Sequence, residues 1–366
     1  MKIAILGTRG IPNYHGGFEQ FAEYFSLYLV KQGHEAVVYN SSEHPFKNKI
    51  FKGVEIIHKK NPEKRLGAIG QFIYDFNCIL DSRKRKFDVI LQLGYTSSSI
   101  WHWLLPKSSL IITNMDGLEW KRSKYSKSVQ KFLLHAEKLA VKSSDHLIAD
   151  SIGIKEYLKS KYGKESNYIA YGANVFDNPN KSIIKKYGVN TFAYNMLIAR
   201  IEPENNIEEI LDGFHSSNSK MPFLVIGKHE ANKFGIYLSN KYKSDHRIKF
   251  IGGIYDIEVL NNLRYYSNIY FHGHSVGGTN PSLIEAMGSN TLIIANDNNF
   301  NKHILGQDAF YFKSSSDVKN YVESISKSNH KDFVLNNKIK VEEKFNWSII
   351  NNKYLSLITK STDRQG

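Results

Sequence analysis

The chain has 366 residues, which is enough for two domains with a core each, and its formal net charge is +14. No uncharged apolar run approaches the roughly 18 residues that would span a bilayer, and the N-terminus has no secretory signal pattern. The single cysteine, Cys78, excludes an internal disulfide and fits a reducing compartment, so we expect a cytoplasmic protein.

Positive charge is concentrated in the first half of the chain. Residues 1–175 carry 26 Lys and Arg against 16 Asp and Glu, a net of +10, whereas residues 176–366 carry 23 against 19, a net of +4. Dense basic runs lie at 83–86 and 121–131. Such a field attracts an anionic inner membrane leaflet, a pyrophosphate-linked lipid or nucleic acid, or it is simply a solvated basic face. Nucleic acid is the least favoured partner, because no aromatic-interleaved binding motif accompanies the runs.

The first 40 residues predict a strand, a glycine loop, an amphipathic helix and a second strand. Apolar residues recur at spacings of three and four from Phe18 to Leu29, which is typical of one helix face. Gly16 and Gly17 come directly before this helix. A glycine loop at a helix N-terminus favours an anion, because N–H groups and the helix dipole face it. The alternative is a βαβ unit with a flexible loop, since neither a dinucleotide fingerprint nor a Walker loop is present.

Strands and helices continue to alternate up to residue 170, which predicts a mostly parallel sheet with helices on both faces. The expected strands are 54–58, 88–93, 110–114, 146–149 and 168–170, and the expected helix is 129–143. Asp116, Glu119 and Trp120 follow the strand 110–114. Carboxylates beside an aromatic ring suit sugar hydroxyls, and the alternative is an Asx turn in which Asp116 bonds its own loop.

The polar composition of residues 175–194 predicts a linker, and a second series of alternating strands and helices begins after it. The expected strands are 195–199, 222–226, 249–251, 269–272, 291–295 and 309–312, and the expected helices are 207–215, 257–263 and 281–288. Two successive α/β halves suggest a cleft between them, where ligands of open sheets bind. We therefore expect domains at 1–175 and 190–340, with a C-terminal helix within 341–366 that packs across them.

Arg200 follows the first strand of the second half, and Asn205 precedes the next helix. An arginine at a strand end can clamp a phosphate through two N–H groups. The alternative is a surface arginine that pairs with Glu202 or Glu204.

A second glycine-to-helix anion site is expected near residue 280. Gly277 and Gly278 open a helix that Asn280 caps and that Pro281 begins. Glu285 lies one turn into this helix, where its carboxylate can accept hydrogen bonds from ribose hydroxyls or serve a structural role.

His272 and His274 share one face of the preceding strand. No third ligand is evident beside them. We therefore expect them to line the donor site rather than to bind a metal ion.

Four motifs together carry a family resemblance: GTRGIPNYHGGFEQ, MDGLEWKR, ARIEPENN and HGHSVGGTNPSLIEAM. On these motifs nearly the whole chain resembles retaining glycosyltransferase family four, in the bacterial branch of rhamnosyltransferases of capsule and surface-polysaccharide assembly. The resemblance implies an α/β protein of GT-B fold with two Rossmann-like domains whose parallel sheets face a central cleft. It implies a nucleotide-sugar in the C-terminal domain, an acceptor in the N-terminal domain, and neither metal nor other cofactor.

The resemblance also assigns roles to residues in both halves. It gives Arg200 and Asp116 catalytic roles, Arg200 through contact with the donor diphosphate, and it puts Glu285 on the nucleotide ribose. The implied donor site comprises Gly16, Gly17, Arg200, Asn205, Gly278, Thr279, Asn280, Ser282 and Glu285, and the implied acceptor site comprises Asp116, Glu119 and Trp120.

Two positions depart from the family pattern. The first Glu of its E-x7-E signature is Gly277 here, and the Lys that accompanies the arginine is Asn205. The absence of the Glu at position 277 removes a contact to the sugar hydroxyls. The absence of the Lys at position 205 removes a cation from the diphosphate site, and Arg9 could replace that cation. Both changes fit a donor unlike UDP-glucose, such as a 6-deoxy sugar.

These observations predict a retaining transferase that moves L-rhamnose from dTDP-L-rhamnose onto a growing surface glycan. The expected acceptor is linked to polyprenyl pyrophosphate at the anionic inner membrane face, and no nucleic acid takes part. Arg200, helix N-termini and backbone amides would stabilise the departing diphosphate. The alternatives are a UDP-hexose or UDP-N-acetylhexosamine transferase, and a non-catalytic scaffold protein that binds nucleotide-sugars.

Overall fold

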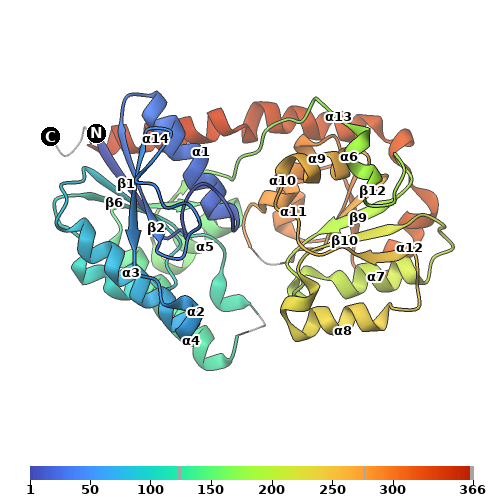
Figure 1. Cartoon of the computed structure of the whole chain (residues 1–366), viewed down its shortest axis with the longest axis horizontal. Coiled ribbons are helices and arrows are strands. Elements are labelled where there is room, and N and C mark those ends of the chain that lie inside the picture. Colours follow the sequence, from blue (N-terminus) through green and yellow to red (C-terminus); the bar gives the residue numbers. More distant parts are fainter. Residues whose placement is uncertain (123–124, 276, 363–366) are drawn as a thin grey trace. The chain divides into compact units, whose positions relative to one another are not determined.

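The chain folds into two compact units, each with its own sheet (Figure 1). The computed structural model describes residues 1–122, 125–275 and 277–362. The first unit comprises residues 1–121, 125–170 and 347–366, and the second comprises residues 122–124 and 171–346.

The first unit is built on an eight-stranded sheet of order β3-β4-β2-β1-β5-β6-β7-β8. Its strands are β1 (Lys2–Leu6), β2 (Glu35–Ser41), β3 (Ile50–Phe51), β4 (Val54–Lys59), β5 (Val89–Leu93), β6 (Leu110–Asn114), β7 (His146–Ala149) and β8 (Asn167–Tyr168). All neighbours are parallel except β3 and β4. The strand order reverses at β1, because β2, β3 and β4 lie on one side of it and β5 to β8 lie on the other.

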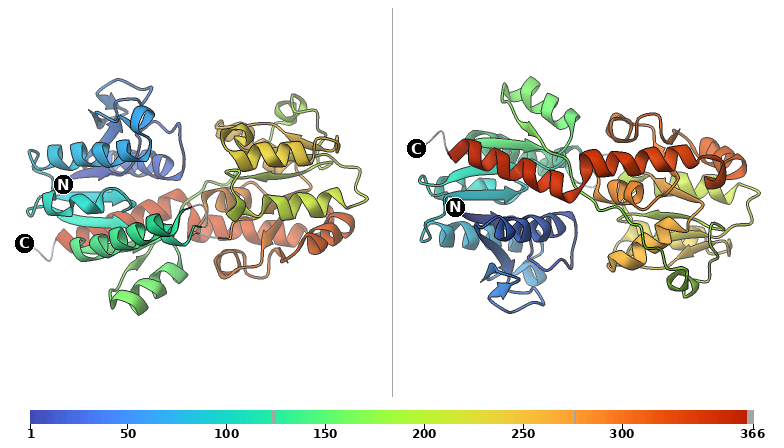
Figure 2. Two further views of the ribbon diagram at one scale, coloured as in Figure 1. Left: turned by 90° about the horizontal axis from the view of Figure 1, so that it is seen from below. Right: turned by 90° about the horizontal axis from the view of Figure 1, so that it is seen from above.

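Helices of the first unit include the C-terminal helix of the chain. They are α1 (Gly17–Lys31), α2 (Glu63–Leu66), α3 (Ala68–Ser82), α4 (Lys127–Ser143), α5 (Ile152–Tyr162) and α14 (Trp347–Thr362), with short 3-10 turns η1 (Ser99–Leu104) and η2 (Glu119–Lys121). α14 lies against α1 (Figure 2), where the Trp347 ring stacks on Tyr24 and the Tyr354 ring packs on Phe21, each with centroids 4.5 Å apart. The first unit is therefore completed by a helix that follows the second unit in sequence.

The second unit has a six-stranded parallel sheet of order β11-β10-β9-β12-β13-β14. Its strands are β9 (Asn195–Ile198), β10 (Phe223–Ile226), β11 (Ile248–Phe250), β12 (Ile269–His272), β13 (Ile293–Asn296) and β14 (Phe310–Phe312). Its helices are α6 (Lys181–Lys185), α7 (Ile207–His215), α8 (Lys233–Lys241), α9 (Ile257–Tyr265), α10 (Pro281–Gly288), α11 (Asn299–Leu305), α12 (Ser315–Ser324) and α13 (Lys331–Lys340), and its single-turn elements are η3 (Pro203–Asn205), η4 (His229–Ala231), η5 (Lys327–Asn329) and η6 (Val341–Phe345).

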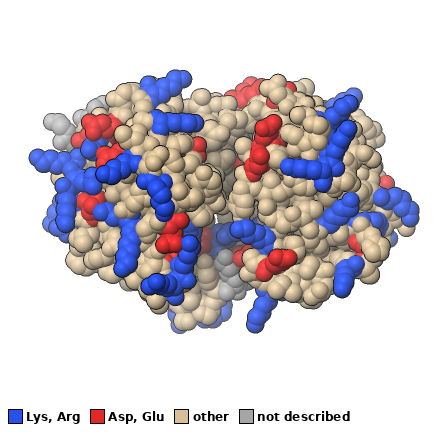
Figure 3. All heavy atoms as spheres, in the orientation of Figure 1, with Lys and Arg blue, Asp and Glu red and all other residues tan. Residues whose placement is uncertain are grey.

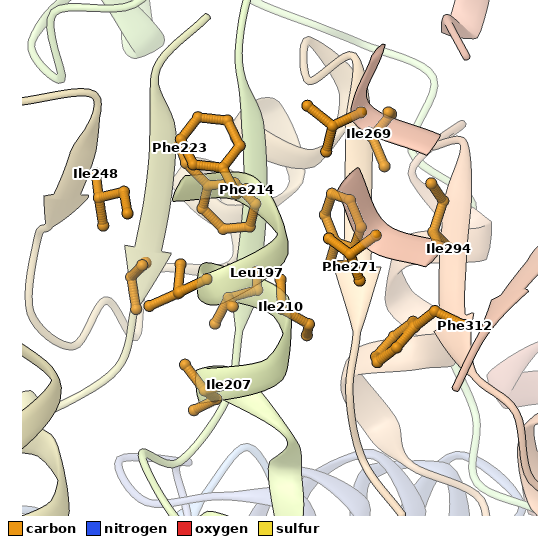
Figure 4. Close-up of a cluster of buried hydrophobic side chains, with 14 of the residues drawn as sticks. Leu197, Ile207, Ile210, Phe214, Phe223, Ile248, Ile269, Phe271, Ile294 and Phe312 are labelled. Carbon is orange, nitrogen blue, oxygen red and sulfur yellow. The ribbon is translucent and has the colours of Figure 1, made fainter. Parts of the chain in front are cut away.

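The core of the second unit forms where α7 packs on the centre of the sheet (Figure 4). Apolar residues of α7 at spacings of three and four face the strands, among them Ile210 and Phe214. The Phe214 ring lies 4.9 Å from that of Phe223 on β10, and the Phe223 ring lies 5.5 Å from that of Phe271 on β12. Burial of this face packs α7 against the strands β9, β10 and β12, and so restricts the loop that joins β9 to α7.

The expected α/β architecture with two parallel sheets is confirmed. The helices expected at 207–215 and 281–288 have those bounds. Sequence analysis missed the helices α2, α3, α5, α6, α8, α11, α12 and α13. Among the described residues, no helix combines the length and the hydropathy of a transmembrane span.

Replacement of Phe214 with Ala should reduce the free energy of unfolding by about 3–5 kcal/mol, because it leaves a cavity between α7 and the sheet. Urea unfolding of the purified protein measures the change. Ile236→Ala on α8, where the side chain is 48% exposed, is the control and should change stability by less than about 0.5 kcal/mol. Equal losses in the two variants would contradict this account of the core.

Candidate active site

The sequence-predicted donor residues of the second unit gather at the carboxyl ends of β9 and β12. These two strands are neighbours, and the strand order reverses between them. In open parallel sheets a crevice forms at such a reversal, since the following loops turn to opposite faces of the sheet. Arg200 lies just beyond β9, and the glycine loop that leads to α10 lies beyond β12.

Arg200 offers an unpaired guanidinium at this end of the sheet. Its side chain is exposed, and no hydrogen bond or ion pair joins that side chain to any other described residue. The main chain around it is ordered by Asn205, whose Nδ2 donates to the Arg200 carbonyl at 2.7 Å and whose N–H donates to the Glu202 carbonyl at 3.0 Å. Asn205 therefore shapes the loop that presents Arg200.

The loop after β12 is tied directly to the loop after β9. Ser275 Oγ donates to the Glu204 carbonyl at 2.7 Å, and Asn206 Nδ2 donates to the Gly273 carbonyl at 2.7 Å. A Cβ at Gly273 would lie 2.0 Å from the Asn205 carbonyl oxygen, so only glycine allows this approach. The two loops thus form one rigid platform.

The start of α10 confirms the predicted cap. Asn280 Oδ1 accepts hydrogen bonds from the Ser282 N–H at 3.0 Å and from Ser282 Oγ at 2.9 Å, and Pro281 occupies the first helical position. Gly277 has φ +128°, a conformation that favours glycine, and no described atom outside the adjoining residues lies within 4 Å of the place a Cβ would take. An open space therefore adjoins the positive end of this helix.

Glu285 is held in place by a buried arginine that sequence analysis did not identify. Arg264 Nη2 donates to Glu285 Oε2 at 2.6 Å, while Arg264 Nη1 donates to Asn261 Oδ1 at 3.0 Å. The Arg264 side chain is only 1% exposed. Within the described residues, Glu285 Oε1 accepts no hydrogen bond. The ion pair thus orients the carboxylate and leaves one oxygen for a ligand. The sequence feature that could have indicated this ion pair is the position of Arg264 at the end of the apolar face of α9.

His272 and His274 stack on each other with ring centroids 4.4 Å apart. In the described part of the chain, neither ring nitrogen of His272 has a hydrogen-bond partner, and neither does His274 Nδ1. Burial lowers the pKa of His272 well below its usual range. Burial, reinforced by Arg200 and Arg122, lowers the pKa of His274 to about 3. Both rings are therefore neutral at physiological pH, and each can donate one hydrogen bond and accept another.

Arg122, which belongs to the second unit, adds another cation near His274. Its Nη1 lies 3.5 Å from Glu204 Oε1, and both side chains are largely buried. Sequence analysis counted Arg122 only within a basic run. By contrast Arg9, the suggested substitute for the missing lysine, is bound by the Glu63 carboxylate in the first unit at 2.6 and 3.2 Å.

In the first unit, Gly16 is the N-cap of α1 and Gly17 begins the helix. Asn13 Oδ1 accepts from the N–H groups of His15 and Gly16 at 2.9 and 3.2 Å. The buried carboxylate of Glu19 lies in the first turn, where its Oε1 accepts from the Arg9 N–H at 2.9 Å. An acidic group therefore already complements the positive end of α1, which makes this terminus less suited to an anion than that of α10.

The predicted acceptor residues lie on the segment after β6. Asp116 has φ +50°, and its N–H donates to Asn114 Oδ1 at 2.9 Å, so Asn114 makes the Asx turn. Asn114 Nδ2 also donates to the hydroxyl of Tyr354 on α14 at 2.8 Å. The C-terminal helix thus supports the loop that carries Asp116, Glu119 and Trp120.

A buried carboxylate on α4, which sequence analysis missed, anchors Trp120. Glu137 is 1% exposed and accepts from Trp120 Nε1 at 3.2 Å. Its other oxygen accepts from the hydroxyls of Tyr157 and Tyr162 at 2.7 and 2.6 Å and from Lys161 Nζ at 3.3 Å. Burial and this carboxylate raise the pKa of both tyrosines, so their hydroxyls remain donors.

No group of three or more His, Cys, Asp or Glu suited to a metal ion occurs within residues 1–122, 125–275 and 277–362. The positive charge of the candidate donor site comes from arginines and a helix terminus.

Stability should fall as the pH drops from 7 to 5, in part because of the two buried histidines. Unfolded, each takes up a proton near its ordinary pKa of 6.5, but the folded protein keeps both neutral and so binds fewer protons. Urea unfolding at several pH values should show that the free energy of unfolding decreases less between pH 7 and pH 5 in His274→Gln than in the parent protein. The exposed His246→Gln serves as the control, and unchanged pH dependence in His274→Gln would refute this assignment.

The two halves of the chain match two different family models. Residues 180–342 match the family described as Glycosyl transferases group 1, and residues 1–174 match a domain of unknown function, DUF1972. No curated protein matches the chain.

Solved structures of the same fold align over nearly the whole chain. Sucrose-phosphate synthase from Thermosynechococcus elongatus has a TM-score of 0.82 at 14% identity, and the alignment covers 99% of each chain. HepE from Anabaena in complex with UDP and glucose has a TM-score of 0.76 at 15% identity, covering 98% of this chain and 100% of that one. WaaG, a glycosyltransferase involved in lipopolysaccharide biosynthesis, has a TM-score of 0.71 at 12% identity, and the alignment covers 98% of this chain and 100% of that one.

These comparisons confirm the expected GT-B fold, and they confirm the expected glycosyltransferase relationship for the second half of the chain. The rhamnosyltransferase branch remains a prediction. The chain therefore combines the GT-B fold with a DUF1972 domain at residues 1–174 and a glycosyl transferases group 1 domain at residues 180–342.

Proposed function

We propose that this protein transfers L-rhamnose, with retention of configuration, from dTDP-L-rhamnose to a growing surface polysaccharide. The observation that carries the transferase part of the proposal is the platform at the carboxyl ends of β9 and β12. Arg200 follows β9, and the N-terminus of α10 and Glu285 follow β12; within the described residues the Arg200 side chain and Glu285 Oε1 have no hydrogen-bond partner. A nucleoside diphosphate needs these groups: cationic donors for its phosphates and an acceptor for its ribose hydroxyls.

In the proposed reaction, the second unit stabilises the diphosphate as its bond to the sugar breaks. The guanidinium of Arg200 and the N–H groups at the start of α10 supply positive charge where negative charge develops. The neutral ring of His274 offers one N–H donor beside them. In this proposal no metal ion is required, because arginines and a helix terminus carry the charge.

The proposed sugar preference rests on Gly277. A carboxylate at this position would bind sugar hydroxyls according to the family resemblance, and here no side chain is present. A 6-deoxy sugar has one hydroxyl fewer to satisfy, which supports L-rhamnose. UDP-glucose is the second candidate donor, favoured by the likeness to HepE, whose structure was solved with UDP-glucose at a TM-score of 0.75 and 14% identity.

The first unit is the proposed acceptor side. Asp116, Glu119 and Trp120 present carboxylates beside an indole ring, a combination that suits sugar hydroxyls. Glu137 fixes Trp120 through its indole N–H, which leaves the ring face for stacking against a sugar. We propose a glycan linked to polyprenyl pyrophosphate as the acceptor.

A mixed apolar and basic surface of the first unit supports attachment to an anionic membrane. Ile69 on α3 is 64% exposed and Phe132 on α4 is 37% exposed, and Phe132 contacts Phe72 with ring centroids 5.6 Å apart. Lys64 and Lys131 are exposed on α2 and α4. Lys and Arg side chains spread over the first unit with Asp and Glu between them (Figure 3). Each basic residue near an anionic leaflet contributes about 1 kcal/mol.

A thermal-shift panel of nucleotides tests the donor. Saturation at 100 times the Kd adds ~2.7 kcal/mol to the stability of the folded protein. We expect a shift with dTDP and dTDP-L-rhamnose that does not depend on Mg²⁺. A shift with UDP-sugars alone would support a transferase that uses a different donor. No shift with any nucleotide would refute the proposal.

Arg200→Ala should lower the transfer rate on the order of 10²-fold or more, because it removes a donor that acts on the developing charge. Arg83→Ala, at an exposed position after α3, is the matched control and should retain full activity. Activity is measured as release of nucleoside diphosphate in the presence of acceptor. Unchanged turnover in Arg200→Ala would remove Arg200 from the mechanism.

The double variant Ile69→Ser/Phe132→Ser should bind vesicles containing anionic lipid several-fold more weakly than the parent protein, because it removes the apolar part of the surface. Co-sedimentation with anionic and with zwitterionic vesicles measures this. Ile50→Ser/Ile236→Ser changes two isoleucines exposed elsewhere and is the control. Equal sedimentation of all three proteins would argue against membrane attachment through this surface.

A further inference from the structure

A cavity of about 350 Å³ lies in the second unit, at the end of the sheet opposite to the candidate donor site. Several lining residues lie three or four residues before a strand begins: Phe192 before β9, Tyr265 before β12 and Asn290 before β13. The cavity therefore opens at the amino ends of the strands, whereas Arg200 and the α10 loop lie at their carboxyl ends. Its remaining walls are Asp177, Lys327, Val334 and Lys338.

Lys327 enters this cavity without a carboxylate partner. Its Nζ donates to the Tyr265 carbonyl and lies 5.1 Å from the ring centroids of both Phe192 and Tyr265. No acidic side chain of the described residues forms an ion pair with it. Burial lowers the pKa of Lys327 to about 7. A desolvated ammonium group without a counter-ion is costly, and a bound anion would offset that cost.

Lys338 provides a second ammonium group in the lining of the cavity. It donates to Asp177 Oδ1 at 2.7 Å and lies 3.9 Å from Glu342 Oε1. Its charge is therefore largely balanced, in contrast to that of Lys327. The rings of Phe192 and Tyr265 and the side chain of Val334 give the cavity an apolar part, beside the polar side chains of Asp177 and Asn290. The combination of apolar walls and one uncompensated cation is typical of a site for a small organic anion.

We propose that this cavity binds a small ligand that carries a carboxylate or phosphate group on a flat apolar body, with Lys327 as the ion-pair partner. The anionic group contacts the Lys327 ammonium, and the body lies against the rings of Phe192 and Tyr265, whose centroids are 6.4 Å apart. The proposal is independent of the sugar-transfer function, since none of these residues belongs to the candidate donor site.

The cavity also touches the two segments by which the chain passes between the units. Asp177 lies shortly after the unit boundary at 170, and Lys338 lies shortly before the boundary at 347. These segments are already joined in the second unit, because the Ala173 N–H donates to the Phe345 carbonyl at 2.8 Å. The Lys338–Asp177 hydrogen bond joins the same two segments at the edge of the cavity, so a bound ligand would add to contacts that already exist.

Binding should depend on pH in a defined direction. An anion stabilises the charged form of Lys327 and so raises its pKa, which means that binding takes up a proton. Affinity should therefore increase as the pH falls from 9 and level off below about 7, where the free lysine is already protonated. Benzoate is a suitable probe because it does not titrate in this range, and benzamide is its uncharged counterpart.

Isothermal titration of benzoate tests the site in the full-length protein. Lys327→Met should weaken benzoate binding by about tenfold or more, the loss expected for one charge-assisted contact. Lys331→Met, at an exposed lysine four residues further along the chain, should bind as the parent protein does. Equal binding by the two variants, or benzamide binding as tightly as benzoate, would overturn the proposal.

Amine labelling of the unmutated protein provides a readout that does not depend on how the variants fold. Peptide mass spectrometry after brief acetylation should show Lys327 reacting with a midpoint near pH 7. Benzoate should slow this reaction and move its midpoint to higher pH, while Lys331 in the same sample stays unaffected. Labelling of Lys327 that ignores benzoate, while nucleotide binding persists, would refute the cavity site and leave the proposed transferase function standing. Phenyl phosphate in place of benzoate tells a phosphate ligand from a carboxylate.

Discussion

The close contact between the loops after β9 and β12 is the constraint on which the candidate site depends. Only a glycine at 273 lets the main chain approach the Asn205 carbonyl, and the Ser275 and Asn206 hydrogen bonds then hold the loops together. Arg200 lies in the loop after β9, and the loop after β12 leads into α10. The site therefore uses backbone geometry to bring its cations together, because no described acidic side chain pairs with Arg200 to hold it in place.

Local sequence patterns predicted much of the fold and part of the site. Strand periodicity located the two sheets, and Asn280 with Pro281 located the start of α10, because caps and strands depend on neighbours in sequence. The Arg264–Glu285 pair and the Trp120–Glu137 hydrogen bond could not be predicted, since each joins helices or loops whose packing no local pattern specifies. α13 was missed because Phe333, Val334 and Leu335 are consecutive rather than helically spaced.

Charge in the second unit follows a simple division. Arginines that orient other residues are buried and paired, as Arg264 is with Glu285 and Arg122 is with Glu204. Arg200 and Lys327 lack such partners within the described chain, and they lie at opposite ends of the same parallel sheet. An unpaired cation is costly in a folded protein unless a ligand or solvent compensates it. Each of the two proposed ligand sites therefore contains a cation that has no acidic partner among the described residues.

The position of α14 has a consequence for synthesis on the ribosome. This helix covers the aromatic side chains of Phe21, Tyr24 and Phe25 on α1, yet the ribosome makes it only after the entire second unit. Synthesis of the first unit therefore starts before that of the second unit and ends after it. Until α14 is made, the aromatic side chains of α1 remain exposed to solvent. The second unit can close as soon as residue 346 has emerged, since its ends meet at the Ala173–Asn346 bridge. Nascent chains that stall before α14 should consequently be those that chaperones recognise through α1.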